Sequence, residues 1–354
     1  MPDRLDVGVV APLVAPLSRR MPYGNHAVIV DLARALTARG HDVTLYCAEG
    51  SEPVSGVEMV EIPVGAQARG AFALLDPERA PIPAMHEAFA RLFARVRRAR
   101  HDAVSQHAFD AEALQLAEGL PVLHTLHLPP IVSRMVQVAR AVSAPLATVS
   151  LAMQRAWIGV GVPTAVLPNG VPDRPATRTT ARRVALIAGR ISPEKGTATS
   201  IRLARRAGLA PLVVGEPYHR AYFELAVRPL LREGELRAPV SRDALADLMS
   251  RSGVTLCPIR WDEPFGLVAA EAQVVGCPVV AYRRGAMSEV VEDGISGILV
   301  PPDDEDIFLA GIRRALGLRR SYVRASARRR LLLEPAVDAY EARLADVARR
   351  RIAA

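Results

Sequence analysis

The sequence is poor in aromatic residues, in cysteine and in lysine. Aromatic residues make up 5% of its 354 residues whereas half are hydrophobic, so we expect an aliphatic core. The cysteines, Cys47, Cys257 and Cys277, show no metal-site spacing, which favours buried free thiols in a reducing compartment. No apolar run approaches the length of a membrane span, so no membrane-spanning helix is expected.

The net charge of +8 comes almost entirely from arginine, because Lys195 is the single lysine. Arginines cluster at residues 95–100 and 319–330 without a nucleic-acid motif, so we expect no nucleic-acid partner. Such clusters are usually solvated faces, and contact with an anionic membrane surface is the alternative. Because the first residues are too polar for a signal peptide, we expect a cytoplasmic protein, or one held peripherally at the inner membrane face.

The length exceeds what one hydrophobic core usually holds, so we expect two domains. Short apolar strands alternate with helices in each half, and a polar, proline-containing segment, 172–180, separates the halves. This alternation predicts an α/β protein with two doubly wound, Rossmann-like domains facing a central cleft. We place the domain boundary between residues 1–170 and 171–334.

Two carboxylates mark the stretch that follows the apolar strand at 254–259. Glu263 lies in the loop at the end of that strand, and Glu271, eight residues later, lies more than one turn into the next helix. Gly266 lets the backbone approach a ligand, and the first N–H groups of the helix can meet an anion. The pattern suits a ligand that carries both phosphate and hydroxyl groups. The alternative is an ordinary strand–helix unit with one surface glutamate and one half-buried glutamate.

Two cations occupy a corresponding position in the same half. Gly189 and Arg190 end a strand, and Lys195 and Gly196 open the helix that follows. Cations beside a helix N-terminus form a diphosphate site that needs no metal. No Asp-x-Asp pair lies in a matching loop, so we expect no metal and no other cofactor. Surface charge is the alternative, and it is weakened because the cations and the glutamates lie at corresponding strand ends.

In the first half, His127 follows the predicted strand 121–126. A histidine at the carboxyl end of such a strand faces the ligand crevice of an open α/β sheet. A structural or solvated histidine is the alternative.

Several motifs of the chain match one family. The run Gly-Arg…Pro-x-Lys-Gly occurs at 189–196, Glu-x7-Glu with Pro-Phe-Gly-Leu at 263–271, and Gly-Cys-Pro-Val-Val at 276–280. A Gly…Glu-Val-Val…Gly-x-x-Gly run spans 285–297, and the first half adds Tyr23, Gly24, Gly-His-Asp-Val at 40–43 and Pro-Asn-Gly-Val at 168–171. Together they resemble the retaining GT-B glycosyltransferases of glycosyltransferase family 4, over nearly the whole chain.

The resemblance implies a role for each matched residue. Arg190 and Lys195 would neutralise the departing nucleotide diphosphate, Glu271 would bind the ribose hydroxyls, and Glu263 would hold the donor sugar. His127 would lie over the reacting sugar from an N-terminal acceptor-binding domain, to which a C-terminal helix at about 335–354 returns. The remaining donor-binding candidates are the glycines and backbone groups of the matched motifs: Gly24, Asn169, Gly189, Phe265, Gly266 and Leu267.

The implied activity is a metal-independent retaining hexosyltransferase with a nucleotide-sugar donor. A UDP-sugar is favoured over a GDP-sugar, and the acceptor is a small molecule or a lipid that the sequence does not identify. A GT-B sugar-nucleotide epimerase, a phosphorylase-like protein and a non-catalytic GT-B partner subunit are the alternatives. The chain departs from the family at Asn25, where a second glycine is common, and at Pro172, which displaces an aspartate. It also lacks the common glycine in the loop 238–241.

Overall fold

The computed structural model describes residues 4–18, 20, 24–72, 75–78, 80–175 and 183–352. Tyr23 and part of the expected linker, 176–180, lie outside the described residues. The chain divides into two compact units, one made of residues 1–18, 25–168 and 334–354, the other of residues 19–24 and 169–333. The division at 168/169 lies two residues before the boundary that we placed after 170. Arg20 and Gly24, which we had assigned to the first domain, group with the second unit.

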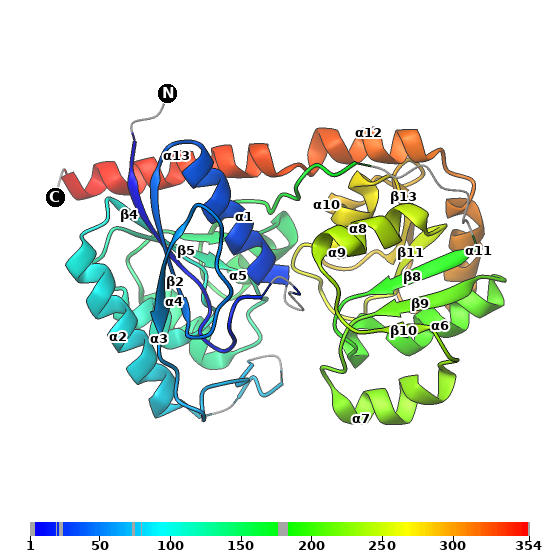
Figure 1. The fold of residues 1–354 in the computed structure, drawn as a ribbon, viewed down its shortest axis with the longest axis horizontal. Coiled ribbons are helices and arrows are strands. Elements are labelled where there is room, and N and C mark those ends of the chain that lie inside the picture. The colour runs from blue at the N-terminus through cyan, green and yellow to red at the C-terminus, as the bar shows by residue number, and fades with distance from the viewer. Residues whose placement is uncertain are drawn as a thin grey trace. The chain divides into compact units, whose positions relative to one another are not determined.

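The first unit is built on a seven-stranded parallel sheet with the order β3-β2-β1-β4-β5-β6-β7 (Figure 1). Its strands are β1 Asp6–Val10, β2 Asp42–Ala48, β3 Glu58–Ile62, β4 Ala103–Gln106, β5 Val122–Leu126, β6 Leu146–Thr148 and β7 Ala165–Val166. The direction of winding reverses between β1 and β4, and open α/β sheets bind ligands beyond the carboxyl ends of the strands at such a point. The loops that begin at His107 and His127 follow β4 and β5.

Helices flank this sheet, and their apolar faces form the core of the unit. They are α1 Gly24–Ala38, α2 Pro83–Ala99, α3 Ala111–Leu116, α4 Ser133–Ala141, α5 Leu151–Gly159 and α13 Leu333–Ile352. In α2, Met85, Phe89 and Phe93 recur at helical spacing and are buried among strand residues such as Tyr46. The sequence pattern does not predict α3 or α4, because they are too short to show a clear helical period.

The C-terminal helix α13 belongs to the first unit, as the resemblance predicted. Glu341 on α13 accepts hydrogen bonds from Arg39 at 2.6 Å and pairs with His41 at 2.9 Å. Tyr340, which is fully buried, donates to Thr125 Oγ1 at 3.3 Å on β5. The helix is therefore attached to the sheet through buried polar contacts as well as apolar packing.

The second unit is built on a six-stranded parallel sheet with the order β10-β9-β8-β11-β12-β13. Its strands are β8 Val184–Ala188, β9 Ala210–Val214, β10 Leu236–Arg237, β11 Val254–Cys257, β12 Val279–Tyr282 and β13 Gly297–Val300. Its helices are α6 Thr197–Arg206, α7 Arg220–Tyr222, α8 Arg242–Arg251, α9 Leu267–Val274, α10 Met287–Val290, α11 Glu305–Ala315 and α12 Arg320–Arg330. Two parallel-sheet α/β units confirm the predicted fold class.

Two local predictions for the second unit were wrong. The helix expected near 222–231 breaks into α7, a π-turn at Phe223–Val227 and a 3₁₀ turn at Arg228–Leu230. Pro229 explains the break, because proline has no N–H to donate within a helix. Lys195 does not open α6 but ends a 3₁₀ turn, Pro193–Lys195, and α6 begins after Gly196.

The arginines of α12 are mostly engaged with the body of their own unit. Arg320 donates to the Ser252 carbonyl at 2.7 Å, and Arg324 donates to the Val274 carbonyl at 3.0 Å. These two contacts hold the helix in place. The other arginines of the cluster are exposed, as expected of a solvated face: Arg319, Arg328, Arg329 and Arg330. On α2, Arg95 and Arg98 are exposed. Within the described chain, no helix is long and apolar enough to cross a membrane.

Candidate active site

The loop after β8 is shaped by glycines that allow close backbone approach. Gly189 has φ +120°, and a Cβ on Gly215, which follows β9, would lie 1.9 Å from the Gly189 carbonyl oxygen. Gly196 has φ +67°, and a Cβ there would lie 2.3 Å from the Pro258 carbonyl oxygen beyond β11. No side chain fits in these gaps. The loop therefore lies flat across the carboxyl ends of β8, β9 and β11.

This packing brings the single lysine to the first glutamate. Lys195 Nζ lies 2.7 Å from Glu263 Oε2, and the Trp261 indole N–H donates to the same oxygen at 2.7 Å. Lys195 Nζ also lies 5.4 Å from the centre of the Trp261 ring. Glu263 is 8% exposed. Within the described part of the chain, both hydrogen bonds use one carboxylate oxygen, which leaves Oε1 for a ligand.

Backbone contacts join the loops that follow β8, β11 and β12. The Arg260 N–H donates to the Glu194 carbonyl at 2.8 Å, and the Ala286 N–H donates to the Glu263 carbonyl at 2.8 Å. A Cβ on Gly285 would lie 2.3 Å from the Glu263 nitrogen, so only glycine allows this approach. Because β8 and β11 are paired neighbours, the structure brings together Lys195 and Glu263 as their positions at strand ends predicted.

Arg190 lies in the same loop, beside an aromatic ring. Its guanidinium carbon is 4.6 Å from the centre of the Tyr218 ring, and one of its nitrogens is 3.8 Å from Glu194. Ser192 donates to Glu194 at 2.6 Å, which orients that carboxylate. A planar cation over an aromatic face is a favourable arrangement. Sequence reasoning missed Tyr218, because it follows a different strand, β9, and carries no motif.

Glu271 is engaged by an arginine that sequence reasoning also missed. Arg242 donates to Glu271 Oε1 through Nε at 2.9 Å and through Nη2 at 2.7 Å. Arg242 is the first residue of α8, whose N-cap is the Ser241 side chain. In the sequence, the loop 238–241 is notable only as a departure from the family pattern. The pairing of Arg242 with Glu271 is apparent only in the folded structure. Two donors on one oxygen orient this carboxylate.

The helix α9 begins at the residues that the sequence singled out. Gly266 caps it with φ +98°, and a Cβ there would lie 2.9 Å from Met287 Sδ. Phe265 is buried and Leu267 is half-buried. The first N–H groups of α9 therefore lie one residue beyond the Glu263 loop, and a helix N-terminus favours negative charge. Another donor candidate, Asn169, is 7% exposed, and its Oδ1 has no hydrogen-bond partner in the described chain.

In the first unit, His127 lies in a group of buried histidines. Its Nε2 is 2.9 Å from His107 Nδ1. Burial, together with a smaller contribution from nearby His26, lowers the pKa of His127 to about 4. Burial also lowers the pKa of His107 well below its usual range, and His127 adds to that effect. Both rings are therefore neutral at pH 7. No group of three or more metal-ligating side chains occurs among the described residues.

Gly24, the remaining candidate, is the exposed first residue of α1. None of the contacts among the described residues indicates a ligand for Gly24. His107 was missed by sequence reasoning, although it lies at the end of β4 just as His127 lies at the end of β5. The equivalent position on the neighbouring strand was the signal that could have found it.

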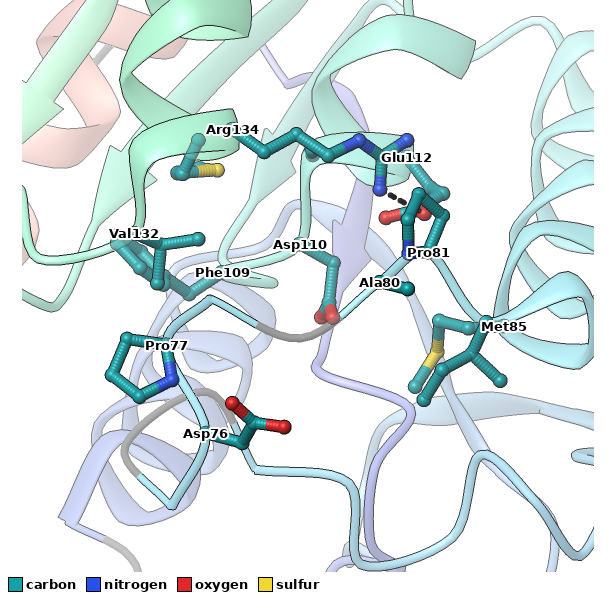
Figure 2. Close-up of a pocket in the computed structure, with 13 residues that line it drawn as sticks. Asp76, Pro77, Ala80, Pro81, Met85, Phe109, Asp110, Glu112, Val132 and Arg134 are labelled. Atoms are coloured by element: carbon teal, nitrogen blue, oxygen red, sulfur yellow. Dashed lines mark hydrogen bonds and ion pairs between the residues drawn. The ribbon is translucent and has the colours of Figure 1, made fainter.

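A pocket opens in the first unit among the loops that follow β3, β4 and β5. Figure 2 shows Arg134 reaching Glu112, with Asp110 pointing toward the hollow between the loops. The Arg134–Glu112 pair is 2.5 Å long. Apolar and polar groups share the lining: Asp76, Pro77, Ala80, Pro81, Ile82, Met85, Phe109, Asp110, Ala111, Glu112, Val132, Arg134 and Met135.

Two parallel α/β units, the second with Lys195 and Glu263 at adjacent strand ends, form the architecture of the GT-B fold. The family model described as Glycosyl transferases group 1 matches residues 173–331, and the model described as Glycosyltransferase Family 4 matches residues 24–174. The chain belongs to glycosyltransferase family 4.

Curated relatives support the same assignment. The phosphatidyl-myo-inositol mannosyltransferase of Mycolicibacterium smegmatis is 30% identical over 355 residues, covering 89% of this chain and 88% of the relative. The D-inositol 3-phosphate glycosyltransferase of Geodermatophilus obscurus is 36% identical over 197 residues, covering 47% of this chain and 43% of the relative. The second match therefore spans less than half the length of that relative.

Solved structures share the fold at low sequence identity. HepE of Anabaena in complex with UDP and glucose has a TM-score of 0.74 and 18% identity, covering 97% of this chain and 100% of that chain. Sucrose-phosphate synthase from Thermosynechococcus elongatus has a TM-score of 0.76 and 17% identity, covering 99% of this chain and 100% of that chain. The chain therefore has the GT-B fold.

Proposed function

We propose that this glycosyltransferase moves a hexose from a nucleotide-sugar to a hydroxyl-bearing acceptor, with retention at the anomeric carbon and without a metal. The observation that carries the proposal is the contact between Lys195, Glu263 and Trp261, because it places a cation and a carboxylate side by side. A nucleotide-sugar offers a partner to each of them, a diphosphate to the cation and sugar hydroxyls to the carboxylate.

The leaving group in this proposal is a nucleoside diphosphate. Lys195, Arg190 and the N-terminus of α9 would stabilise its charge, which grows as the bond to the sugar breaks. In the structure Lys195 is paired with Glu263, and Arg190 lies over Tyr218. We expect a bound diphosphate to draw Lys195 toward it, which would leave Glu263 to accept hydrogen bonds from the sugar. No metal has a role in this scheme.

A UDP-sugar is the donor that we favour. HepE of Anabaena, which shares the fold, has been solved with UDP-glucose. Glu271, oriented by Arg242, would accept hydrogen bonds from the ribose hydroxyls through Oε2, because Arg242 uses Oε1. Asn169 Oδ1, which has no hydrogen-bond partner among the described residues, could accept a hydrogen bond from a ligand hydroxyl or amine. Ribose does not distinguish bases, so a GDP-sugar is the second candidate.

The acceptor in this proposal is a polyhydroxylated ring, free or lipid-linked. The two relatives above are named for inositol phosphate and phosphatidyl-inositol acceptors. The pocket of the first unit combines carboxylates, one arginine and apolar side chains, which suit the hydroxyls and the C–H face of such a ring. We propose a cytoplasmic reaction, and the exposed arginines of α2 would meet the inner membrane face if the acceptor is a lipid.

The test is transfer by the purified protein alone. UDP- and GDP-hexoses are offered with inositol, inositol phosphate and phosphatidylinositol, in EDTA and in added Mg²⁺. We expect one nucleotide-sugar to give a glycosylated product at similar rates in both conditions, with the donor's anomeric configuration by NMR. Strict metal dependence or inversion would overturn the mechanism. Epimerised nucleotide-sugar without transfer would replace a transferase by an epimerase, and activity only with a second protein would indicate a partner subunit.

A further inference from the structure

Three buried polar side chains lie in line at the carboxyl ends of β4 and β5. Ser105 Oγ is 2.8 Å from His107 Nε2, and His107 Nδ1 is 2.9 Å from His127 Nε2. Ser105 and His107 are 0% exposed and His127 is 6% exposed. His107 thus uses both ring nitrogens inside the protein. His127 uses one, and its Nδ1 has no hydrogen-bond partner among the described residues.

The positions of the protons follow from the Ser105 hydroxyl. In the described chain its only hydrogen-bond partner is His107 Nε2. If it accepted a hydrogen bond there, its own hydrogen would be buried without an acceptor, which is unfavourable. It therefore donates to His107 Nε2. His107 then carries its proton on Nδ1 and donates to His127 Nε2, so that neutral His127 carries its proton on Nδ1.

The C-terminal helix supports this line of hydrogen bonds. The Tyr340 ring on α13 lies 5.8 Å from the His107 ring, centre to centre, with an angle of 37° between the planes. Tyr340 is anchored in turn by its hydrogen bond to Thr125 Oγ1. The His107 ring is thus held by a hydrogen bond at each end and by an aromatic ring packed against it.

We propose that His107 is a positioning residue which, together with Ser105 and Tyr340, fixes His127 as an N–H donor that presents Nδ1 to an oxygen of a bound substrate. The identity of the ligand rests on the function proposed above, whereas the hydrogen-bond geometry does not. In this arrangement His127 is not a base, because the nitrogen available to the substrate already carries the proton. Its task is to orient and polarise a substrate oxygen.

Nuclear magnetic resonance of the full chain with isotope-labelled histidine tests the geometry without any substrate. Nitrogen shifts and hydrogen couplings distinguish an imidazole protonated at Nδ1 from one protonated at Nε2. Spectra of His127→Gln and His107→Gln assign the two signals. We expect protonation of His127 at Nδ1 in the native protein and a mixture of tautomers in Ser105→Ala. Protonation at Nε2 in the native protein, or no change in Ser105→Ala, would refute the proposal.

Kinetics with the best donor test the consequence. We expect His107→Phe, which keeps a ring against Tyr340 but no hydrogen bond, to lower kcat on the order of tenfold. His107→Asn, whose amide nitrogen can take the place of Nδ1, should recover most of that loss. His86→Gln, which changes an exposed imidazole on α2 outside this line of hydrogen bonds, is the control and should stay near the native rate.

Calorimetry with UDP separates a positioning role from general damage. The proposed UDP contacts belong to the second unit, so all three variants should bind UDP like the native protein. If His107→Asn is as slow as His107→Phe while both bind UDP normally, the hydrogen bond does not matter and the proposal fails. If the tautomers are as expected but no sugar is transferred by the native protein, the proposed function fails and the proton assignment stands.

Discussion

Acid should destabilise the first unit through histidines that are buried in their neutral form, and His124 offers the cleanest test. It lies in the middle of β5, is 1% exposed, and shares a hydrogen bond of 3.1 Å with Gln106. Burial lowers its pKa from 6.5 to about 3. A histidine whose pKa is lowered by folding stabilises the fold above its unfolded pKa. That contribution is lost as the pH falls from 6.5 toward the folded value, because only the unfolded chain takes up the proton.

The magnitude follows from the difference in proton uptake. At about pH 5 His124 is still neutral in the folded chain. In the unfolded chain its imidazole is protonated, because this pH lies about 1.5 units below the unfolded pKa. Each unit is worth about 1.4 kcal/mol, so His124 alone should lower the free energy of unfolding by about 2 kcal/mol between pH 7 and pH 5. His26 and His127, whose pKa values burial lowers to about 4, add losses in the same direction.

Urea unfolding, followed by tryptophan fluorescence at the two pH values, measures this loss. Trp261→Phe leaves Trp157, which is fully buried in the first unit, as the single reporter. In that background we expect His124→Asn, which keeps an amide donor for Gln106, to reduce the pH-dependent loss by about 2 kcal/mol. His86→Gln removes an exposed imidazole on α2 and is the matched control. An unchanged loss in His124→Asn would refute the assignment of a buried neutral imidazole.

Two further predictions concern the second unit. Trp261→Phe keeps an aromatic ring beside Lys195 but removes the N–H that donates to Glu263. We therefore expect kcat/KM for the donor to fall about threefold to tenfold, while the UDP affinity measured by calorimetry is unchanged. An equal loss of UDP affinity would assign Trp261 to the nucleotide instead. Lys195→Ala should weaken UDP binding about tenfold to a hundredfold, whereas Glu263→Gln should bind UDP at least as tightly, because it releases Lys195, and should still lose kcat/KM. If Glu263→Gln loses UDP as Lys195→Ala does, the division between diphosphate and sugar contacts is wrong.

Local sequence determined the alternation of strands and helices and where the chemistry lies along the chain. Apolar runs of strand length, glycines with left-handed φ such as Gly196 and Gly266, and helical stretches are short-range features that the chain displays directly. The carboxyl ends of parallel strands share one edge of a sheet, so Lys195 and Glu263 could be expected near each other before any coordinates. The family resemblance added their roles, which spacing alone does not contain.

Tertiary structure decided which partner each polar group has. Glu271 pairs with Arg242 across 29 residues, His127 with His107 across 20, and Tyr340 with Thr125 across 215. Such pairs depend on which strands become neighbours and on the direction of each side chain, and neither leaves a periodic trace in the sequence. Trp261 shows the same limit at short range: it lies two residues from Glu263, yet only the turn of the loop directs its N–H to that carboxylate.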